Sequence, residues 1–379
     1  MKKIWILIAA LLVLSGCGSM SSFSGEAESK VSTEKLRGAS FTFFDVGQGD
    51  STLIEADDGT TILIDTGRSD DKRILTYLEE KNLEKIDLLL LTHPHADHIG
   101  NADKIIQTYK PKEIWMDGLA FNSSIYERVI DAALDSEAKY KEPRTGDKAS
   151  FGPFELSVLS PKTLSDDANN DSIAVRLTYK DISAIFTGDA EKGREQEMTD
   201  SGMNLKADIL DLGHHGSSTS NQPFFLDKVK PEVAIYSAEK GNSYGHPHVE
   251  VLDWLKKRNI KTYGTDVNGT VTISTDGESL HVKTETEGTP KSGSSYKYDA
   301  NKRADSKTEE GKTEEMPASI NLNKASSDEL QFLPLIGPEL ASKIIAERPY
   351  QSIDDLKRIN GIGDGIVRQI KAQGIATVK

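Results

Sequence analysis

Leu91-Thr92-His93-Pro94-His95-Ala96-Asp97-His98-Ile99-Gly100 places three of the chain's eight histidines and one aspartate within six consecutive positions. The apolar run at residues 86–91 is typical of a buried strand, so the polar residues follow the carboxyl end of that strand. Open α/β proteins bind their ligands at that edge. Because imidazole nitrogens and carboxylate oxygens are the usual ligands of Zn²⁺ and similar ions, this stretch predicts a metal centre.

Two more groups of metal-type ligands follow predicted strands further along the chain. The run at residues 185–187 leads into Asp189, and residues 209–212 lead into the paired His214 and His215. Three strand ends that each deliver such ligands are the arrangement of a two-metal hydrolase. In such a centre one carboxylate bridges two ions about 3.5–4 Å apart, and the ions stabilise the attacking and leaving oxygens of a phosphoryl transfer.

Short β-rich runs alternate with helical patterns from Gly38 to Thr284. Turn signals at Asp58-Gly59 and Asp276-Gly277 predict a hairpin near each end of this region. The alternation predicts a layered α/β domain, and the hairpins predict mixed rather than all-parallel sheets. Strands are predicted at residues 40–46, 51–56, 60–65, 113–116, 154–159, 172–178, 183–187, 209–212, 233–236, 271–274 and 279–283. Helices are predicted at residues 71–81, 123–138, 191–200 and 249–258.

These motifs resemble the metallo-β-lactamase superfamily, whose signature is H-x-H-x-D-H followed by further His, Asp and His ligands. With Phe44-Asp45-Val46-Gly47-Gln48-Gly49-Asp50-Ser51, Ile64-Asp65-Thr66-Gly67 and Gly245-His246-Pro247-His248, residues 36–284 look most like the soluble hydrolase domain of the ComEC family of DNA-uptake channels. The resemblance implies a four-layer αββα sandwich with two divalent ions, zinc or manganese, at the edge of the two sheets. The metal ligands that it implies are His93, His95, Asp97, His98, Asp189 and His215.

The resemblance also divides these ligands between the ions. The two histidines of H-x-H would bind one ion, the following D-H pair would bind the other, and Asp189 would bridge them. The order within the His214–His215 pair stays open, and His214 would face the substrate or support a ligand. The catalytic residues are then expected to be Asp97, His214 and His246.

One departure from the superfamily concerns its middle histidine, which is absent. Asn169-Asn170 stands in its expected place, before the predicted strand at residues 172–178. An asparagine oxygen is a weaker and harder ligand than imidazole, so we expect the first site to bind its ion less tightly or to prefer Mn²⁺ to Zn²⁺. The same replacement is typical of the ComEC-like branch and counts against a true β-lactamase. Asn170 is therefore expected to stand beside the metal ligands.

Four other residues are considered around the centre. The resemblance gives Asp65 hydrogen bonds that hold the ligand loop, the alternative being an ordinary turn acid. Gln48 and Asp50 lie in a glycine-flanked loop where backbone can approach a ligand closely, although a plain tight turn fits as well. His246 precedes Pro247, which restricts its backbone, so its ring can protonate a leaving oxygen, bind a phosphate, or merely cap the next helix.

Residues 318–379 contain two related glycine turns, each of which precedes a predicted helix. Such a turn presents free N–H groups and the positive end of a helix dipole, which suits a phosphate. The segment resembles tandem helix-hairpin-helix motifs, most closely the DNA-binding domain of the ComEA family, which implies a small all-α domain that holds DNA without sequence preference. The expected DNA contacts are Gly337, Gly361, Ile362, Gly363, Lys343 and Arg368. Leu335 replaces the first glycine of the first hairpin, and a protein-interaction module is the alternative.

The ends and the charge of the chain add two expectations. Residues 1–16, with Leu14-Ser15-Gly16-Cys17, resemble a bacterial lipoprotein signal, which implies lipid on Cys17, a tether at residues 17–35 and an extracytoplasmic protein anchored to the cell membrane. An uncleaved anchor is the alternative. Residues 285–317 have the composition of a disordered linker. The net charge of −14 excludes global attraction to nucleic acid, so an anionic substrate must be held by a metal or a local patch.

The leading hypothesis is a surface-anchored, metal-dependent phosphodiesterase or nuclease that acts on DNA and works with DNA-uptake machinery. A second hypothesis is hydrolysis of a cell-wall phosphodiester, such as a phosphorylcholine or teichoic-acid substituent. A third is a non-catalytic DNA-capture lipoprotein, which the missing histidine at Asn169-Asn170 favours.

Overall fold

The structure is a computed structural model that describes residues 38–293 and, near the C-terminus, residues 319–325, 330, 333, 336, 338–359 and 362–378. The predicted lipoprotein signal with Cys17, the tether, and residues 294–317 of the predicted linker lie outside the described residues. In the described ranges, no helix combines the length and the apolar character needed to cross a membrane.

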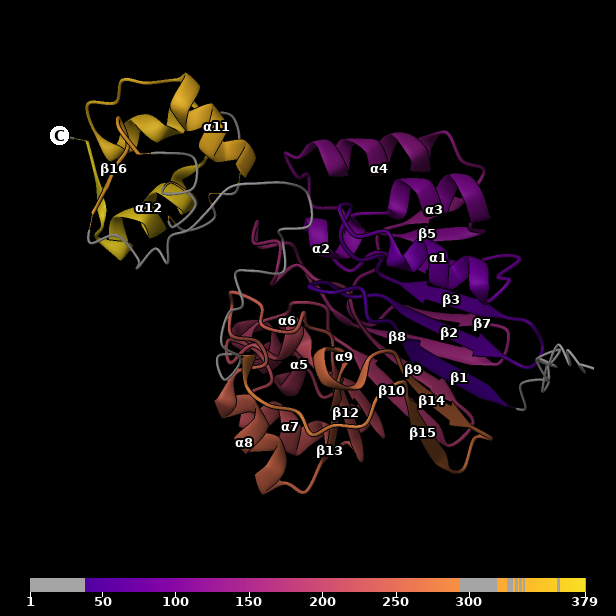
Figure 1. The fold of residues 1–379 in the computed structure, drawn as a ribbon. Coiled ribbons are helices and arrows are strands. Elements are labelled where there is room, and N and C mark those ends of the chain that lie inside the picture. Colours follow the sequence, from indigo (N-terminus) through magenta and orange to yellow (C-terminus); the bar gives the residue numbers. More distant parts are fainter. Residues whose placement is uncertain are drawn as a thin grey trace, which may run out of the picture. The chain divides into compact units, whose positions relative to one another are not determined.

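Two mixed β-sheets form the centre of the N-terminal domain (Figure 1). The first contains, in spatial order, β15 (Leu280–Thr284), β14 (Val271–Thr275), β1 (Ala39–Phe43), β2 (Thr52–Ala56), β3 (Thr61–Ile64), β4 (Leu88–Leu90), β5 (Glu113–Trp115) and β6 (Lys139–Lys141). The second contains β13 (Lys261–Gly264), β12 (Val233–Tyr236), β11 (Ile209–Asp211), β10 (Ile182–Phe186), β9 (Ala174–Tyr179), β8 (Phe154–Ser160) and β7 (Lys148–Phe151). The predicted hairpins are confirmed, because β2 pairs antiparallel with β3 and β14 pairs antiparallel with β15.

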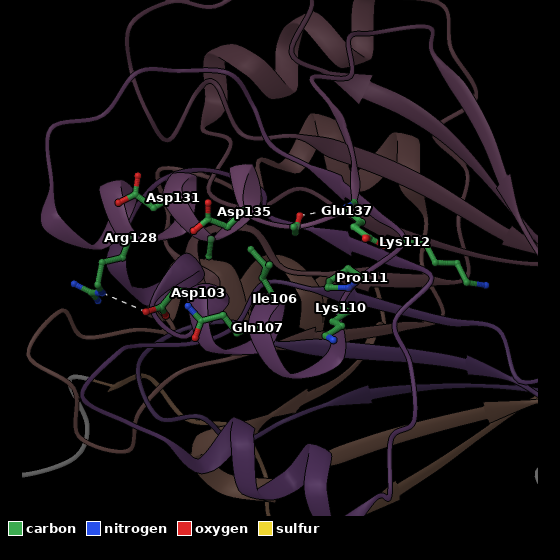
Figure 2. Close-up of a pocket in the computed structure, with 13 residues that line it drawn as sticks. Asp103, Ile106, Gln107, Lys110, Pro111, Lys112, Arg128, Asp131, Asp135 and Glu137 are labelled. Carbon is green, nitrogen blue, oxygen red and sulfur yellow. Dashed lines mark hydrogen bonds and ion pairs between the residues drawn. The ribbon is translucent and has the colours of Figure 1, made fainter.

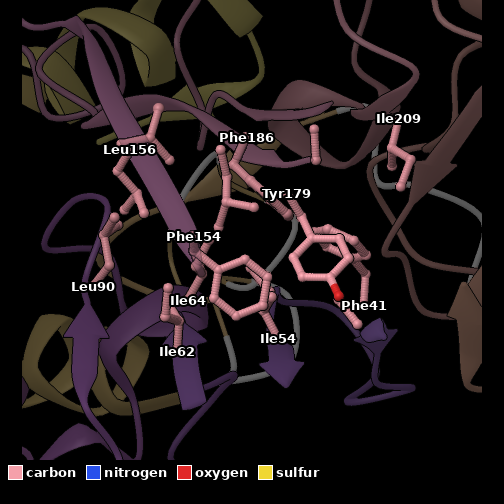
Figure 3. Close-up of a cluster of buried hydrophobic side chains, with 14 of the residues drawn as sticks. Phe41, Ile54, Ile62, Ile64, Leu90, Phe154, Leu156, Tyr179, Phe186 and Ile209 are labelled. Carbon is pink, nitrogen blue, oxygen red and sulfur yellow. The ribbon is translucent and has the colours of Figure 1, made fainter. Parts of the chain in front are cut away.

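Apolar side chains from both sheets fill the space between them. Phe41 and Ile54 from the first sheet share one buried cluster with Phe154 and Phe186 from the second (Figure 3). Side chains of a strand alternate between its two faces, so every second residue of these strands can enter this layer. Burying each large apolar side chain stabilises the fold by about 1.5–3 kcal/mol. The two sheets therefore form the inner layers of a sandwich.

Helices cover the outer face of each sheet (Figure 1). Leu78 and Ile105 pack in a buried cluster with the first sheet, and Val251 and Leu255, spaced by one helical turn, do so with the second. The first sheet carries α1 (Arg73–Glu80), α2 (Ala96–Ile99), α3 (Ala102–Tyr109) and α4 (Ser124–Leu134). The second carries α5 (Lys192–Asp200), α6 (Gly213–Gly216), α7 (Pro223–Val229), α8 (Val249–Lys257) and α9 (Thr265–Asn268). This is the expected αββα sandwich, although the predicted helices do not include α2, α3, α6, α7 and α9.

The parallel parts of both sheets decide where the polar loops meet. β3 and β4 pair in parallel in the first sheet, as do β10, β11 and β12 in the second. The carboxyl ends of parallel strands lie at the same edge of a sheet. Asp65, the histidine-rich loop, Asp189 and the His214–His215 pair follow these ends, so the topology gathers them at one edge of the sandwich.

Hydrogen bonds of the N-terminal domain continue past residue 284, its predicted boundary. The Thr286 N–H donates to the Asn268 carbonyl at 3.0 Å, and the Gly293 N–H donates to the Pro247 carbonyl at 3.1 Å. Residues 285–293 are therefore hydrogen-bonded to this domain, and the rest of the predicted linker lies outside the described residues.

The C-terminal domain is helical and has a core of its own. It contains α11 (Pro338–Ala346), the 3-10 helix η3 (Ile353–Arg358) and α12 (Asp364–Gln373), which enclose the buried Leu322, Ile344, Leu356 and Ile370. One feature departs from the predicted all-α domain: β16 (Ile320–Asn321) and β17 (Ala376–Thr377) pair in parallel. Two-residue strands are too short to give the alternating pattern by which strands are predicted.

Candidate metal centre

Asp189 lies between two groups of histidines. It follows β10 through Gly188, whose φ of 52° turns the chain at the strand end. Its Oδ2 lies 3.6 Å from His93 Nε2, and its Oδ1 lies 3.3 Å from His98 Nε2. The Asp189 N–H donates to the Ser172 hydroxyl at 3.1 Å, which fixes the position of the turn. One carboxylate therefore reaches both halves of the H-x-H-x-D-H motif, as a bridging ligand must.

The first group of ligand atoms belongs to His93, His95 and Asp189, which lie within 4.8 Å of one another. His93 Nε2 and His95 Nδ1 are 3.0 Å apart, and their rings meet edge to face. His214 lies on the same side, with its Nε2 at 3.7 Å from Asp189 Oδ2. Its N–H donates to the Gly188 carbonyl at 3.1 Å, so the β10 and β11 loops are joined directly.

The second group contains Asp50, His98, Asp189 and His215, again within 4.8 Å of one another. His215 Nδ1 lies 3.5 Å from Asp50 Oδ2, and its Nε2 lies 3.2 Å from Asp97 Oδ2. The structure thus brings all six predicted metal ligands together. His215, and not His214, belongs to this second group. His215 is also the histidine that the family resemblance implies as the ligand.

Asp50 is the ligand-type residue that the sequence reasoning did not assign. Its N–H donates to the Asp97 carbonyl at 3.1 Å, which ties its loop to the histidine-rich loop. Gly49 makes this approach possible, because a Cβ at that position would lie 2.5 Å from the same carbonyl. The available signal was an aspartate in a glycine-flanked loop shortly after β1. Sequence alone does not show that this loop meets the β4 loop.

Asp65 holds His98 and the ligand loop together, as expected. Its Oδ2 lies 2.8 Å from His98 Nδ1, while the Thr92 N–H and hydroxyl donate to the two carboxylate oxygens at 2.8 and 2.7 Å. A carboxylate on Nδ1 selects the tautomer whose Nε2 lone pair is free. In His98 that lone pair faces Asp189.

The electrostatics of the centre suit a cation. Burial lowers the pKa of His98, but the carboxylates of Asp189 and Asp65 outweigh it and hold that pKa well above its usual value. Burial and the neighbouring His98 keep the pKa of His93 well below its usual value. The clustered aspartates therefore create a strongly negative local potential beside a neutral imidazole ligand.

The donor atoms also fit metal ions. His98 Nε2 and Asp189 Oδ1 are buried and have no hydrogen bond within the described part of the chain. Each such atom costs about 1–3 kcal/mol when left without a partner. Nitrogen and oxygen donors of this kind suit Zn²⁺ or Mn²⁺, so the cluster can hold metal ions.

The profile of the Metallo-beta-lactamase superfamily matches residues 44–239. The chain belongs to the metallo-β-lactamase superfamily. This superfamily consists largely of metal-dependent hydrolases, and the histidine and aspartate cluster lies at the sheet edge where its centre is expected. Residues 318–373 match the Helix-hairpin-helix motif, which agrees with the resemblance of the C-terminal segment.

Three proteins are similar in sequence to parts of this chain. ComE operon protein 3 of Bacillus subtilis (strain 168) is 34% identical over 246 residues, which cover 60% of this chain and 32% of that protein. Recombination protein 2 of Haemophilus influenzae is 30% identical over 247 residues, or 63% of this chain and 29% of the other. A Deoxyribonuclease of Thioalkalivibrio sp. (strain K90mix) is 47% identical over 60 residues, or 16% of this chain and 17% of the other. The chain thus spans less than a third of the length of the first two relatives.

The two asparagines of the Asn169-Asn170 pair differ in how their side-chain oxygens are used. Asn170 Oδ1 accepts a hydrogen bond from the Glu191 N–H at 3.3 Å, so it is already used. Asn169 Oδ1 is buried and has no hydrogen-bond partner in the part of the chain that the structure describes. Ser172 of the same turn contacts Asp189, which places the turn beside the centre. Asn169 rather than Asn170 therefore has an oxygen left for a ligand role.

His246 lies next to both histidines of the β11 loop. Its ring centroid is 5.6 Å from that of His214 and 6.0 Å from that of His215, and its buried Nδ1 has no hydrogen bond among the described residues. Burial and these neighbours lower its pKa to about 3, so the ring is neutral near pH 7. His248, not His246, occupies the N-cap of α8, and its side chain makes no capping bond there.

The remaining predicted residues divide between the two domains. Gln48 is buried, and its Oε1 accepts from the Glu239 N–H at 3.3 Å, which joins the loops that follow β1 and β12.

Of the expected DNA contacts in the C-terminal domain, Gly337 and Gly361 lie outside the described residues. Lys343 and Arg368 lie on α11 and α12, and Gly363 is the N-cap of α12. Ile362 is buried in the domain core, so any DNA contact of this residue has to use its backbone.

A hollow of about 800 Å³ lies between α3 and α4, and none of the metal ligands lines it (Figure 2). Its lining mixes acids such as Asp131 with bases such as Lys110, and Arg128 Nε pairs with Asp103 Oδ2 at 3.2 Å. The hollow is therefore separate from the metal centre, and its mixed charge selects no single class of ligand.

Proposed function

We propose that this protein is a metal-dependent phosphodiesterase that cleaves DNA. The observation that carries the proposal is the position of Asp189, whose two oxygens reach both ligand groups. Divalent ions, when bound there, polarise a phosphoryl group and activate water for attack. His246, which is neutral, binds a phosphate oxygen, and the more exposed His214 donates the proton that the leaving oxygen needs.

DNA as the substrate is supported by the second domain and by the relatives. Helix-hairpin-helix motifs present backbone N–H groups to phosphates, and residues 318–373 match such a motif. The names Recombination protein 2 and Deoxyribonuclease both refer to DNA transactions. Because both domains belong to one chain, DNA held by the second domain would be at a raised local concentration at the metal centre.

A role in DNA uptake at the cell surface completes the proposal. Its support is the similarity to ComE operon protein 3 and the lipobox-like sequence that ends at Cys17. Lipid on Cys17 would hold the hydrolase and its DNA-binding domain on the outer side of the cell membrane, beside the uptake machinery. Labelling cells with a tagged fatty acid tests this, because label must appear on the wild type and disappear in Cys17→Ala.

The catalytic proposal is tested on the full chain by metal analysis together with cleavage of fluorescent DNA. We expect stoichiometric Zn²⁺ or Mn²⁺ and metal-dependent cleavage that is lost in Asp189→Ala and His95→Ala. Unchanged cleavage in either variant contradicts the mechanism. Turnover of a glycerol-phosphate polymer without any DNA cleavage would instead support the wall-phosphodiester hypothesis, and absence of bound metal would support DNA capture without catalysis.

A further inference from the structure

An exposed tyrosine lies beside the metal centre. Tyr244 is 56% exposed, which is more than the other exposed tyrosine of the domain, Tyr140, at 45%. Its ring stacks on that of His246, with centroids 5.6 Å apart and planes inclined by 20°. The ring therefore extends outward from a residue that we assign to phosphate binding, and its exposed surface can receive a second planar group.

The loop that carries Tyr244 is held by a single asparagine. Asn242 Oδ1 accepts from the N–H groups of Tyr244 and His246 at 3.1 and 3.0 Å. Asn242 Nδ2 donates to the His246 carbonyl at 2.6 Å, and His248 Nε2 lies 3.2 Å from the Tyr244 carbonyl. These bonds fix the tyrosine backbone relative to His246, so the ring is positioned before any ligand arrives.

The positively charged side chain of Arg68 lies close to the loop that carries Tyr244. Arg68 lines a hollow of about 190 Å³ together with Gln48 and Glu239, and its side chain is 41% exposed. Asn242 Nδ2 donates to the carbonyl of Glu239 at 2.9 Å, so this hollow adjoins the loop that carries Tyr244. The hydrogen bond to Asp70 is the main reason for the raised pKa of Arg68, and the charges of Asp97 and Tyr244 add to it. Asp70 engages Nε and Nη2 at 2.9 and 3.0 Å, which leaves Nη1 without a partner among the described residues.

We propose that Tyr244 and Arg68 form a nucleotide subsite, in which the base of an unstacked nucleotide lies against the tyrosine ring and its phosphate pairs with the guanidinium. The inference rests on the proposed function, because both residues flank the metal centre where the phosphodiester would react. Stacking on an aromatic ring accepts every base, and guanidinium geometry matches phosphate oxygens. A base inside a duplex has no free face, so this subsite takes single-stranded or locally opened DNA.

Tyr244 and Arg68 together also disfavour the cell-wall phosphodiesters of the second hypothesis. A polyol phosphate offers no flat group to Tyr244 and gains little from its exposed ring. A choline group could contact an aromatic ring through a cation–π interaction, but the nearby positive charge of Arg68 opposes it. The tyrosine and the arginine together therefore select a planar base joined to an anion.

The test uses the full chain supplied with Mn²⁺ and three versions of one oligonucleotide: single-stranded, annealed to its complement, and with abasic sites in place of the bases. We expect Tyr244→Ala to raise KM for the single strand about 5- to 100-fold, which is the range of one lost base stack. KM for the abasic strand should stay at the wild-type value. Tyr244→Phe, which keeps the ring, should behave as wild type, and Tyr244→Leu, which keeps apolar bulk, should behave as alanine.

Arg68→Gln should raise KM on both the intact and the abasic strand. It should also lower the slope of log KM against log salt by about 0.7, the value for one phosphate contact on a single strand. Tyr140→Ala and Arg128→Gln are matched controls, because these side chains are 45% and 47% exposed on β6 and α4. Neither control should change KM, and metal content should be equal in all variants.

Two outcomes separate this inference from the proposed function. If the wild type cleaves none of the oligonucleotides, the proposed function fails and the subsite fails with it. If the wild type cleaves the single strand but Tyr244→Leu leaves KM unchanged, or raises it equally on the abasic strand, the subsite is wrong while the nuclease stands. Preferred turnover of glycerophosphocholine over the single strand would also overturn the subsite.

Discussion

Asp189 Oδ1 lies 3.3 Å from His98 Nε2, and neither atom makes a hydrogen bond among the described residues. When the imidazole is protonated the two atoms form an ion pair, and when it is neutral both offer lone pairs that a cation between them would engage. Asp65 holds the other nitrogen of the same imidazole, so the free lone pair is aimed at the carboxylate. This relationship is the strongest structural argument for a metal ion at the edge of the two sheets.

Replacing Asp189 by Asn should remove metal without unfolding the protein. The amide keeps the shape of the side chain but loses the charge and one of the two ligand oxygens. We expect the bound metal to fall by at least one ion per chain, and DNA cleavage to fall by at least about 100-fold, because metals contribute several kcal/mol to such reactions. Elemental analysis and a cleavage assay measure both. Asp131→Asn, an exposed acid on α4, is the control, and full metal content in Asp189→Asn would refute the bridging role.

Asp65→Asn should weaken metal binding indirectly. An amide can still face His98 Nδ1 but no longer favours the tautomer with a free Nε2 lone pair. Loss of such a supporting carboxylate typically lowers metal affinity about 10- to 100-fold. Titration against a competing chelator measures this change, with the exposed Asp181→Asn as the control. If Asp65→Asn binds metal as tightly as the wild type, Asp65 is an ordinary turn acid that does not support metal binding.

Asn169 and Asn170 provide a matched pair. Asn169→Ala removes the buried oxygen that has no described partner, whereas Asn170→Ala removes a bond to the Glu191 N–H. We expect only Asn169→Ala to lower Mn²⁺ occupancy at the site of His93 and His95. Metal content and electron paramagnetic resonance of bound Mn²⁺ report this difference. An equal effect of the two substitutions, or an effect of Asn170→Ala alone, would reverse the assignment.

Asp117→Asn should change how stability depends on pH. Asp117 follows β5, is 1% exposed, and has one oxygen without a described hydrogen bond, and burial raises its pKa from 3.8 to about 7. The folded protein then keeps this proton up to about pH 7, whereas the unfolded chain releases it near pH 4. The contribution of Asp117 to the free energy of unfolding is therefore largest below pH 4. It declines between pH 4 and pH 7 and no longer changes above pH 7.

The asparagine variant cannot ionise, so it should lack that decline and be more stable than wild type at pH 8 by up to about 4 kcal/mol. Denaturant unfolding at pH 5 and pH 8 measures the difference. Parallel pH profiles of the two proteins would contradict the raised pKa.

Arg368→Gln should weaken DNA binding by the full chain. Arg368 is exposed on α12 and pairs with none of the described residues, whereas Lys371 on the same helix pairs with Asp354 at 2.7 Å. Removing one phosphate contact should lower the salt slope of binding by about 1 for Arg368→Gln and by less for Lys371→Gln. Fluorescence anisotropy at several salt concentrations measures these slopes. Equal slopes in wild type and Arg368→Gln would exclude this residue from the DNA contact.

The sequence by itself predicted the fold class and the two family resemblances, which are confirmed, and it named six candidate metal ligands. Alternation of apolar residues and the turns at Asp58-Gly59 and Asp276-Gly277 are local properties, which is why they predicted the mixed sheets. The ligands His93, His95, Asp97 and His98 lie within one short motif, so their clustering needed no tertiary information.

Only the tertiary structure decided which residues from distant loops meet. Asp50 joins His215 across 165 positions of sequence, and Arg68 lines a hollow that adjoins the loop of Tyr244, 176 positions further along the chain. The choice between Asn169 and Asn170 likewise depends on which oxygen the Glu191 N–H takes. Local patterns carry the period of a helix or strand, whereas contacts between loops are set by sheet order and parallel pairing, which no short stretch of sequence encodes.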